Sequence, residues 1–138
     1  MKQHSTNYFN TFIEVAEDCS TETGLVPPKR GEKKTIANYQ YDLVQSKPYQ
    51  LTSDEIFFKV FAIRKDLAES EMDAERKKYF SKGQPCFRAS PLTKSYGWGV
   101  HSNADGKVAI YARESAEYQR FLENEDIKKV KAMRSKRK

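Results

Sequence analysis

Two segments of alternating apolar and polar residues, 98–102 and 107–113, most constrain the fold of this 138-residue chain. A period of two places successive side chains on opposite faces of a strand. Asn103 and Gly106 stand between the segments, and both residue types accept the backbone angles of a tight reversal. The pattern predicts a hairpin with four residues on a core-facing side: Trp98, Val100, Val108 and Ile110.

The opposite face of the predicted hairpin has small residues in its middle and polar groups around them, which would leave a shallow floor where a ligand could approach the backbone. It carries Gly99, His101, Lys107, Ala109, Tyr111 and Arg113. A further strand is expected at 87–90, and it would turn Arg88 to the same face if Phe87 points inward. Guanidinium groups bind carboxylate or phosphate through paired hydrogen bonds, which suits an anionic ligand. We therefore predict four ligand-binding residues, with an ordinary solvated sheet face as the alternative: Arg88, His101, Tyr111 and Arg113.

Two helices are predicted in the first half of the chain. Residues 52–55 read Thr-Ser-Asp-Glu, a capping box that satisfies free amides at the start of a helix. Four apolar residues follow at helical spacing: Ile56, Val60, Ile63 and Leu67. An earlier helix is expected to begin after the cap Thr35 and to end near Ser46, before Pro48. Its packing face is expected to hold Ile36, Tyr39 and Leu43.

Weaker signals place the remaining elements. A strand with at least one buried side is predicted at 9–16, and a Pro- and Gly-containing loop at 17–34. A charge-rich helix is expected at 69–81, and a short one after the cap Ser115. Residues 127–133 fit either a strand or a helix.

These elements predict an α+β fold in a single domain over residues 1–138. Its antiparallel sheet would combine the N-terminal strand with the strands after Cys86, and the helices after Thr35 and Thr52 would cover one face. Residues 1–6 are expected to be mobile, and residues 127–138 form a basic C-terminal segment.

The net charge of +6 is concentrated in that C-terminal segment. The last twelve residues hold seven Lys or Arg and no acid, so the rest of the chain is close to neutral. Such a segment is consistent with electrostatic attachment to nucleic acid, although it has no base-reading chemistry of its own. A solubilising terminus is the alternative.

Cys86 and His101 fall on one predicted face, which allows a thiol nucleophile with an imidazole base. No catalytic motif surrounds Cys86, and a small buried cysteine explains the same residue, so enzymatic activity is the less favoured interpretation. Cys19 and Cys86 lie in no metal-ligand spacing, and we expect two free thiols and no metal. Phosphate-binding and dinucleotide-binding glycine motifs are absent, so no cofactor is expected.

No apolar run reaches the roughly 20 residues that cross a bilayer, and the N-terminus lacks the apolar core of a signal peptide. We therefore expect a cytoplasmic protein without membrane contact.

Five sequence blocks occur in order along the chain: TNYFNTFIEVAEDC, KTIANYQYDLV, TSDEIFFKVFAIR, KGQPCFRASPLTKSYGWGVH and KAMRSKR. With these blocks the chain resembles a family of small, functionally uncharacterised bacterial proteins. The resemblance covers residues 6–137 and implies one complete domain that includes the basic segment. It brings no activity, cofactor or site residue.

The sequence thus favours a non-enzymatic binding domain for an anionic small molecule or nucleic acid, through the polar sheet face and the basic C-terminus. A nucleic-acid-associated protein and a thiol-dependent enzyme are the alternatives. A protein-interaction adaptor would need an exposed apolar patch, for instance around Phe12 or Tyr39.

Overall fold

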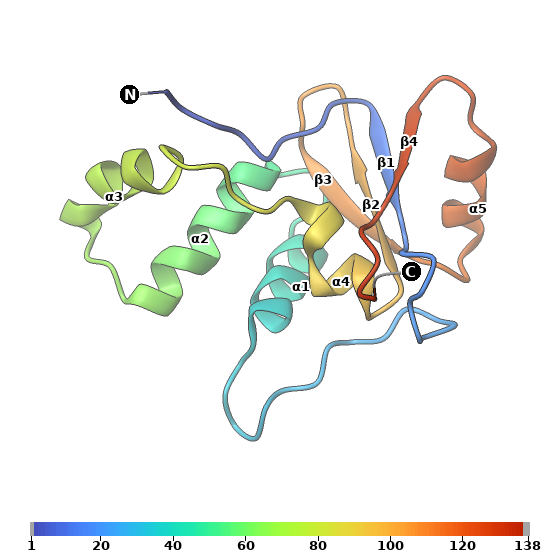
Figure 1. Cartoon of the computed structure of the whole chain (residues 1–138), viewed down its shortest axis with the longest axis horizontal. Helices are drawn as coiled ribbons and strands as arrows, with labels where there is room; N and C mark the ends of the chain where they lie inside the picture. Colours follow the sequence, from blue (N-terminus) through green and yellow to red (C-terminus); the bar gives the residue numbers. More distant parts are fainter. Residues whose placement is uncertain (1, 137–138) are drawn as a thin grey trace.

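The computed structural model describes residues 2–136 and holds a four-stranded sheet with helices on both of its faces (Figure 1). The strands are β1 (Thr11–Glu14), β2 (Trp98–Ser102), β3 (Val108–Ala112) and β4 (Lys128–Lys131). The α-helices are α1 (Ile36–Ser46), α2 (Ser53–Lys65), α3 (Met72–Tyr79), α4 (Pro91–Lys94) and α5 (Ala116–Glu123). Two short 3₁₀ turns, η1 (Glu69–Glu71) and η2 (Phe87–Ala89), precede α3 and α4. Positions 1, 137 and 138 of the predicted terminal segments lie outside the described residues.

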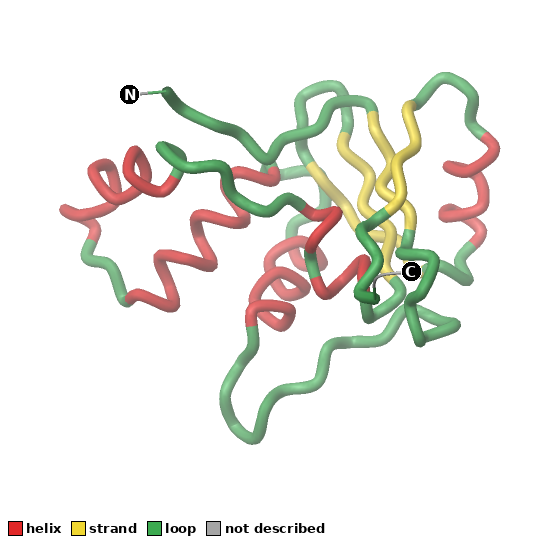
Figure 2. The backbone as a smooth tube through the Cα atoms, in the orientation of Figure 1, coloured by secondary structure: helices red, strands yellow, loops and turns green. Residues whose placement is uncertain are grey.

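The sheet has the strand order β3-β2-β1-β4, and the α+β class is confirmed (Figure 2). The predicted hairpin of β2 and β3 is present, and β2 also pairs antiparallel with β1. β4 runs parallel to β1, with Thr11 opposite Lys128 and Ile13 opposite Val130. The prediction of a fully antiparallel sheet is therefore wrong at this edge. The chain reaches β4 from β3 through α5, and a helical crossover returns the chain in the same direction, whereas a tight turn reverses it.

Helices pack on both faces of the sheet, so the prediction of a single covered face is wrong. Ile13, Val100 and Ile110 point to the side of α1, α2 and α4, where they form the larger core cluster with Val44, Ile56 and Leu92. Phe12 points to the opposite side and packs against Tyr118 of α5. Because α5 is amphipathic, its apolar side also has to be buried against a sheet face. Phe12 is fully buried and contributes to no exposed patch.

The helix starts agree with the predicted caps. Thr35 and Thr52 each accept a hydrogen bond from a backbone amide three residues on, and the third residue of each helix completes a capping box. The packing face of α1 differs from the prediction, because Ile36 is exposed and Tyr39 and Leu43 are half-buried. The buried residues of α1 are Ala37, Asn38, Gln40 and Val44.

The strand predicted at residues 87–90 is wrong. This segment forms η2 and then caps α4, because Pro91 takes the first helical position and the Ser90 hydroxyl accepts from Leu92 N. Thr93 Oγ1 donates to Phe87 O at 2.5 Å, which holds the two turns together. Arg88 and Cys86 consequently lie outside the sheet.

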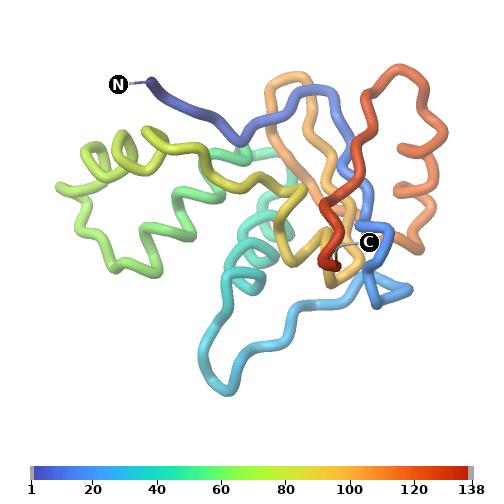
Figure 3. Tube along the Cα trace, viewed as in Figure 1, coloured from blue at the N-terminus to red at the C-terminus, as the bar shows by residue number. Residues whose placement is uncertain are grey.

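Both terminal segments contact the rest of the fold (Figure 3). Near the N-terminus, buried Thr6 donates its amide to Asp54 Oδ1 at 2.6 Å, at the start of α2. Near the C-terminus, the amides of Ser135 and Lys136 donate to the Asp18 carboxylate. Residues 127–133, left open by the sequence pattern, include β4. No helix between residues 2 and 136 is both long enough and apolar enough to cross a membrane.

Candidate functional site

Two of the four predicted ligand-binding residues are joined by a third side chain. Tyr49, between α1 and α2, places its hydroxyl 2.8 Å from His101 Nδ1 and 2.8 Å from Tyr111 Oη. Burial lowers the pKa of His101, and burial together with the Tyr111 hydrogen bond raises the pKa of Tyr49. His101 on β2 and Tyr111 on β3 are thus part of one internal hydrogen-bonded chain.

The two predicted arginines lie elsewhere and bond to backbone carbonyls. Arg113 Nη1 donates to Thr21 O at 2.6 Å, in the long loop after β1. Arg88 Nε donates to Lys131 O at 2.8 Å, beside the opposite edge strand β4. The four residues therefore do not form one cluster, and each arginine ties a separate segment to the fold. Their role in ligand binding stays a prediction.

The sheet face that was expected to leave a shallow floor is filled by aromatic rings. Phe121 of α5 stacks on His101 with ring centroids 4.4 Å apart. Above Gly99, the rings of Phe12 and Tyr118 approach so closely that an added Cβ would lie 2.5 Å from the first ring and 2.6 Å from the second. Tyr118 Oη accepts a hydrogen bond from Val15 N at 2.9 Å. Glycine is therefore required here to admit the rings of the protein itself.

Cys86 and His101, the weak catalytic pair, belong to different sides of the sheet. Cys86 Sγ lies 3.4 Å from the hydroxyl of Tyr8, whereas His101 bonds to Tyr49 and stacks on Phe121. Burial, followed by the hydrogen bond with Cys86, raises the pKa of Tyr8. Cys19 and Cys86 are both free thiols. Among residues 2–136, no group of three or more His, Cys, Asp or Glu side chains is arranged to hold a metal ion.

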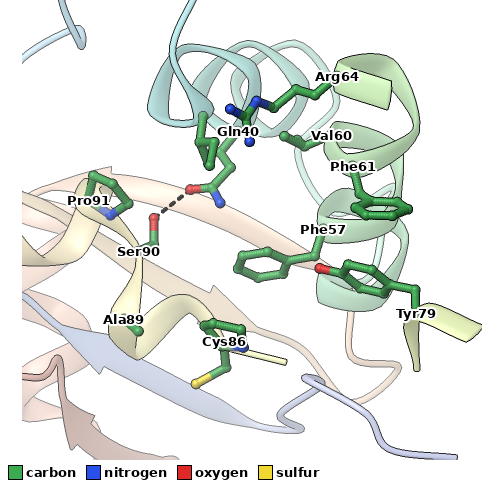
Figure 4. A pocket seen from close by; sticks show the side chains of 12 residues that line it. Gln40, Phe57, Val60, Phe61, Arg64, Tyr79, Cys86, Ala89, Ser90 and Pro91 are labelled. Atoms are coloured by element: carbon green, nitrogen blue, oxygen red, sulfur yellow. Dashed lines mark hydrogen bonds between the residues drawn. The ribbon is translucent and has the colours of Figure 1, made fainter. Parts of the chain in front are cut away.

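A cavity of about 290 Å³ opens on the other side of the molecule, between α1, α2 and residues 85–91 (Figure 4). Most of its wall is apolar, with contributions from α2, α3 and the segment before α4. The lining residues are Ile36, Gln40, Phe57, Val60, Phe61, Arg64, Tyr79, Pro85, Cys86, Ala89, Ser90 and Pro91. Figure 4 shows the Cys86 sulfur turned away from the other lining side chains. The cavity therefore has the character of a small-molecule pocket with few polar groups.

One deeply buried polar side chain of α1, that of Gln40, reaches this cavity. Only 1% of its surface is exposed. Its Oε1 accepts a hydrogen bond from Ser90 Oγ at 2.5 Å. Its Nε2 has no hydrogen-bond partner among the described residues, and Figure 4 shows this amide nitrogen directed into the cavity. Among residues 2–136 no fully buried side-chain nitrogen or oxygen lacks a hydrogen-bond partner, so Gln40 Nε2 is accessible from the cavity and has to find its acceptor there.

Arg64 and Tyr79 stand at different ends of the cavity. The side chain of Arg64, at the end of α2, extends toward α1 and Gln40 (Figure 4) and forms no ion pair or hydrogen bond within residues 2–136. Tyr79 comes from α3, with its hydroxyl group near Phe57 in the same view. Burial, followed by the negative charge of Asp54, raises the pKa of Tyr79. The phenol therefore keeps its proton at neutral pH.

Sequence reasoning did not single out Gln40 or Arg64. Both lie inside well-capped helices, where polar residues are ordinarily solvent-facing. The signal that could have identified Gln40 is its spacing. It stands three residues after Ala37 and four before Val44, and all three are on the buried face of α1. Placing the packing face of α1 on those small and apolar residues would have turned Gln40 inward.

The basic C-terminal segment is partly neutralised by acids of the loop after β1. Lys131 Nζ lies 3.1 Å from Glu17 Oε1, and the Asp18 carboxylate accepts from two backbone amides of this segment. Its association with nucleic acid stays a prediction.

Comparison with known proteins reaches only the level of the family. A family model described as "Family of unknown function (DUF6157)" matches residues 3–138, which confirms the resemblance to an uncharacterised family. No curated protein and no solved structure matches the chain. Function therefore has to be inferred from the geometry of this chain.

Proposed function

The chain belongs to the DUF6157 family, and we propose that it is a binding protein for a small, largely apolar molecule held between α1, α2 and residues 85–91. The observation that carries the proposal is Gln40, buried and with an unpartnered amide nitrogen directed into an apolar cavity. Because this nitrogen has no protein partner within residues 2–136, its acceptor has to come from the cavity, as water or as a ligand atom. A ligand with one hydrogen-bond acceptor would satisfy it.

The walls of the cavity support an apolar body for this ligand. Phe57, Val60 and Phe61 of α2 provide one side, and Pro85 and Pro91 provide part of the other. A volume of about 290 Å³ is near the lower limit for ligand pockets, which indicates a compact molecule of one or two rings or a short chain. Burial of apolar surface would provide most of the binding free energy.

The proposal is tested by titrating the protein with 2-naphthalenemethanol, a neutral compound with a flat apolar body and one hydroxyl group, in a calorimeter. We expect saturable binding at a single site. Ala89 lines the cavity, so Ala89→Phe should fill part of it and weaken binding at least tenfold. Ala104→Phe is the matched control, because Ala104 is exposed in the hairpin turn.

The result is interpreted only if both variants unfold at temperatures close to that of the wild type. Absence of saturable binding by the wild type would contradict the proposal, and so would equal affinities of the wild type and Ala89→Phe. Equal loss of binding in both variants would mean that the probe binds outside this pocket.

A further inference from the structure

We infer that the molecule bound in this pocket carries a carboxylate at the α1 end, where Arg64 and Gln40 would hold it. The inference rests on the proposed function and adds the chemical class and the orientation of the ligand. It also moves the predicted anionic ligand from the sheet face to the opposite side of the molecule.

Two donors are directed toward the α1 end of the cavity, one from buried Gln40 and one from solvent-exposed Arg64. Gln40 Nε2 is directed into the cavity, and the guanidinium group of Arg64 extends toward it from α2 (Figure 4). The other polar atom of the Gln40 amide is already used, since Oε1 accepts from Ser90. This end therefore offers donors and a positive charge but no free side-chain acceptor from Gln40.

The charged residues around the cavity make its two ends electrostatically different. No Asp or Glu lines the cavity, and its one lining cation is Arg64. At Tyr79, burial raises the pKa most, and the negative charge of Asp54 raises it further. Asp54 itself accepts hydrogen bonds from Ser5 and Thr6. An anionic group is thus favoured at the Arg64 end and disfavoured at the Tyr79 end.

A carboxylate fits this pair of donors better than other charged groups. Its two coplanar oxygens match a guanidinium group, and one of them can also accept from an amide nitrogen. A phosphate dianion would bring a second charge into an apolar cavity with a single cation, and the cost of desolvation would exceed the gain. An amine at this end would meet Arg64 as a like charge.

The orientation follows from the position of the apolar wall. With the carboxylate at Gln40 and Arg64, the body of the ligand would lie along Phe57 and Val60, with its far end toward Tyr79. The ligand class is therefore a compact aromatic or alicyclic carboxylic acid.

The test compares three probes that share one ring system: 2-naphthoate, 2-naphthalenemethanol and 2-naphthylmethylamine. At neutral pH we expect the wild type to bind the carboxylate at least tenfold tighter than the alcohol, and the amine most weakly. Arg64→Gln should reduce the affinity ratio of carboxylate to alcohol to about twofold or less. Lys59→Gln is the matched control, because Lys59 is exposed on the same helix and does not line the cavity, and it should leave the ratio unchanged.

A second variant tests the buried donor. Gln40→Met keeps the length of the side chain and removes its hydrogen-bonding groups, so it should weaken carboxylate binding at least fivefold, with thermal unfolding as the check on folding. If the wild type binds the alcohol and the carboxylate equally well, the inferred ligand class is overturned and the proposed pocket function stands. A ratio that survives Arg64→Gln also overturns the inference. If none of the three probes binds, the proposed function fails with it.

Discussion

The two sides of the sheet differ in how completely their polar groups are satisfied. On the α5 side, the hydroxyls of Tyr118 and Tyr49 are bonded to Val15 and to His101 and Tyr111, and aromatic rings pack between helix and sheet. A smaller cavity of about 180 Å³ lies beside Tyr111 and Phe121. On the side of α1 and α2, the cavity is larger and mostly apolar, and the amide nitrogen of Gln40 faces it without a protein partner within residues 2–136.

This difference shows that the number of polar residues on a face is a poor guide to its binding capacity. The α5 side holds the His and Tyr that suggested a ligand site, and those groups are occupied by contacts within the protein. The side with the free donor is built mostly from Phe, Val and Pro. The two sides differ in that a deeply buried side chain, Gln40, directs a donor without a protein partner within residues 2–136 into the larger cavity.

The first prediction tests how tightly the α5 side is packed. Phe12 is fully buried between Tyr118 and Phe121, so Phe12→Ala should lower the free energy of unfolding by about 3–5 kcal/mol in urea denaturation. Phe61, a half-buried residue of the cavity wall, is the matched comparison. Phe61→Ala should lower the free energy of unfolding by only about 1–2 kcal/mol, because this half-buried side chain removes less apolar surface from water on folding. Equal losses for the two variants would contradict the difference between the sides.

The second prediction concerns the close approach at Gly99. Gly99→Ala inserts a methyl group against Phe12 and Tyr118 and should lower the free energy of unfolding by about 1–3 kcal/mol. Gly83→Ala is the control, since an added Cβ there meets no atom within 4 Å. Urea midpoints of the two variants give the comparison, and a neutral Gly99→Ala would mean that α5 is packed more loosely than the structure indicates.

The smallest effect is a dependence of stability on pH through His101. Because burial lowers its pKa in the folded protein, the unfolded chain binds a proton more readily, and acid favours unfolding. The contribution of this group is complete above the ordinary histidine pKa of 6.5 and decreases as the pH falls below it toward the lower folded value. Urea midpoints measured between about pH 7.5 and about pH 5.5 should fall less for His101→Gln than for the wild type. His4→Gln is the matched control. If the urea midpoint falls equally for His101→Gln and the wild type, this linkage is excluded.

The sequence predicted helices and strands well where they depend on contacts between residues close together in the chain. The capping residues Thr35, Thr52 and Ser115 fixed three helix starts, since each hydroxyl bonds to an amide a few residues away. Alternation around the turn at Asn103 and Gly106 predicted the hairpin for the same reason. The segment at 87–90 was mistaken for a strand because four residues are too few to establish a period.

The features of the site that the sequence did not reveal depend on contacts between distant segments. Gly99 and Ala109 were interpreted as an open floor, although the apolar residues predicted in the helix after Ser115 also needed a surface to cover. The availability of Gln40 depends on Ser90, fifty residues away along the chain, and no local pattern reports such a pair. Arg64 could be identified only once the cavity beside it was known.

The parallel pairing of β1 with β4 has a consequence for the order in which the protein is assembled. β1 lies inside the finished sheet, but its partner β4 is synthesised only after β2, β3 and the five α-helices. Contacts between such distant segments form slowly, because the intervening chain must first be ordered. One edge of β1 therefore remains without its backbone partners until residues 128–131 have been synthesised, and the sheet cannot be completed before then.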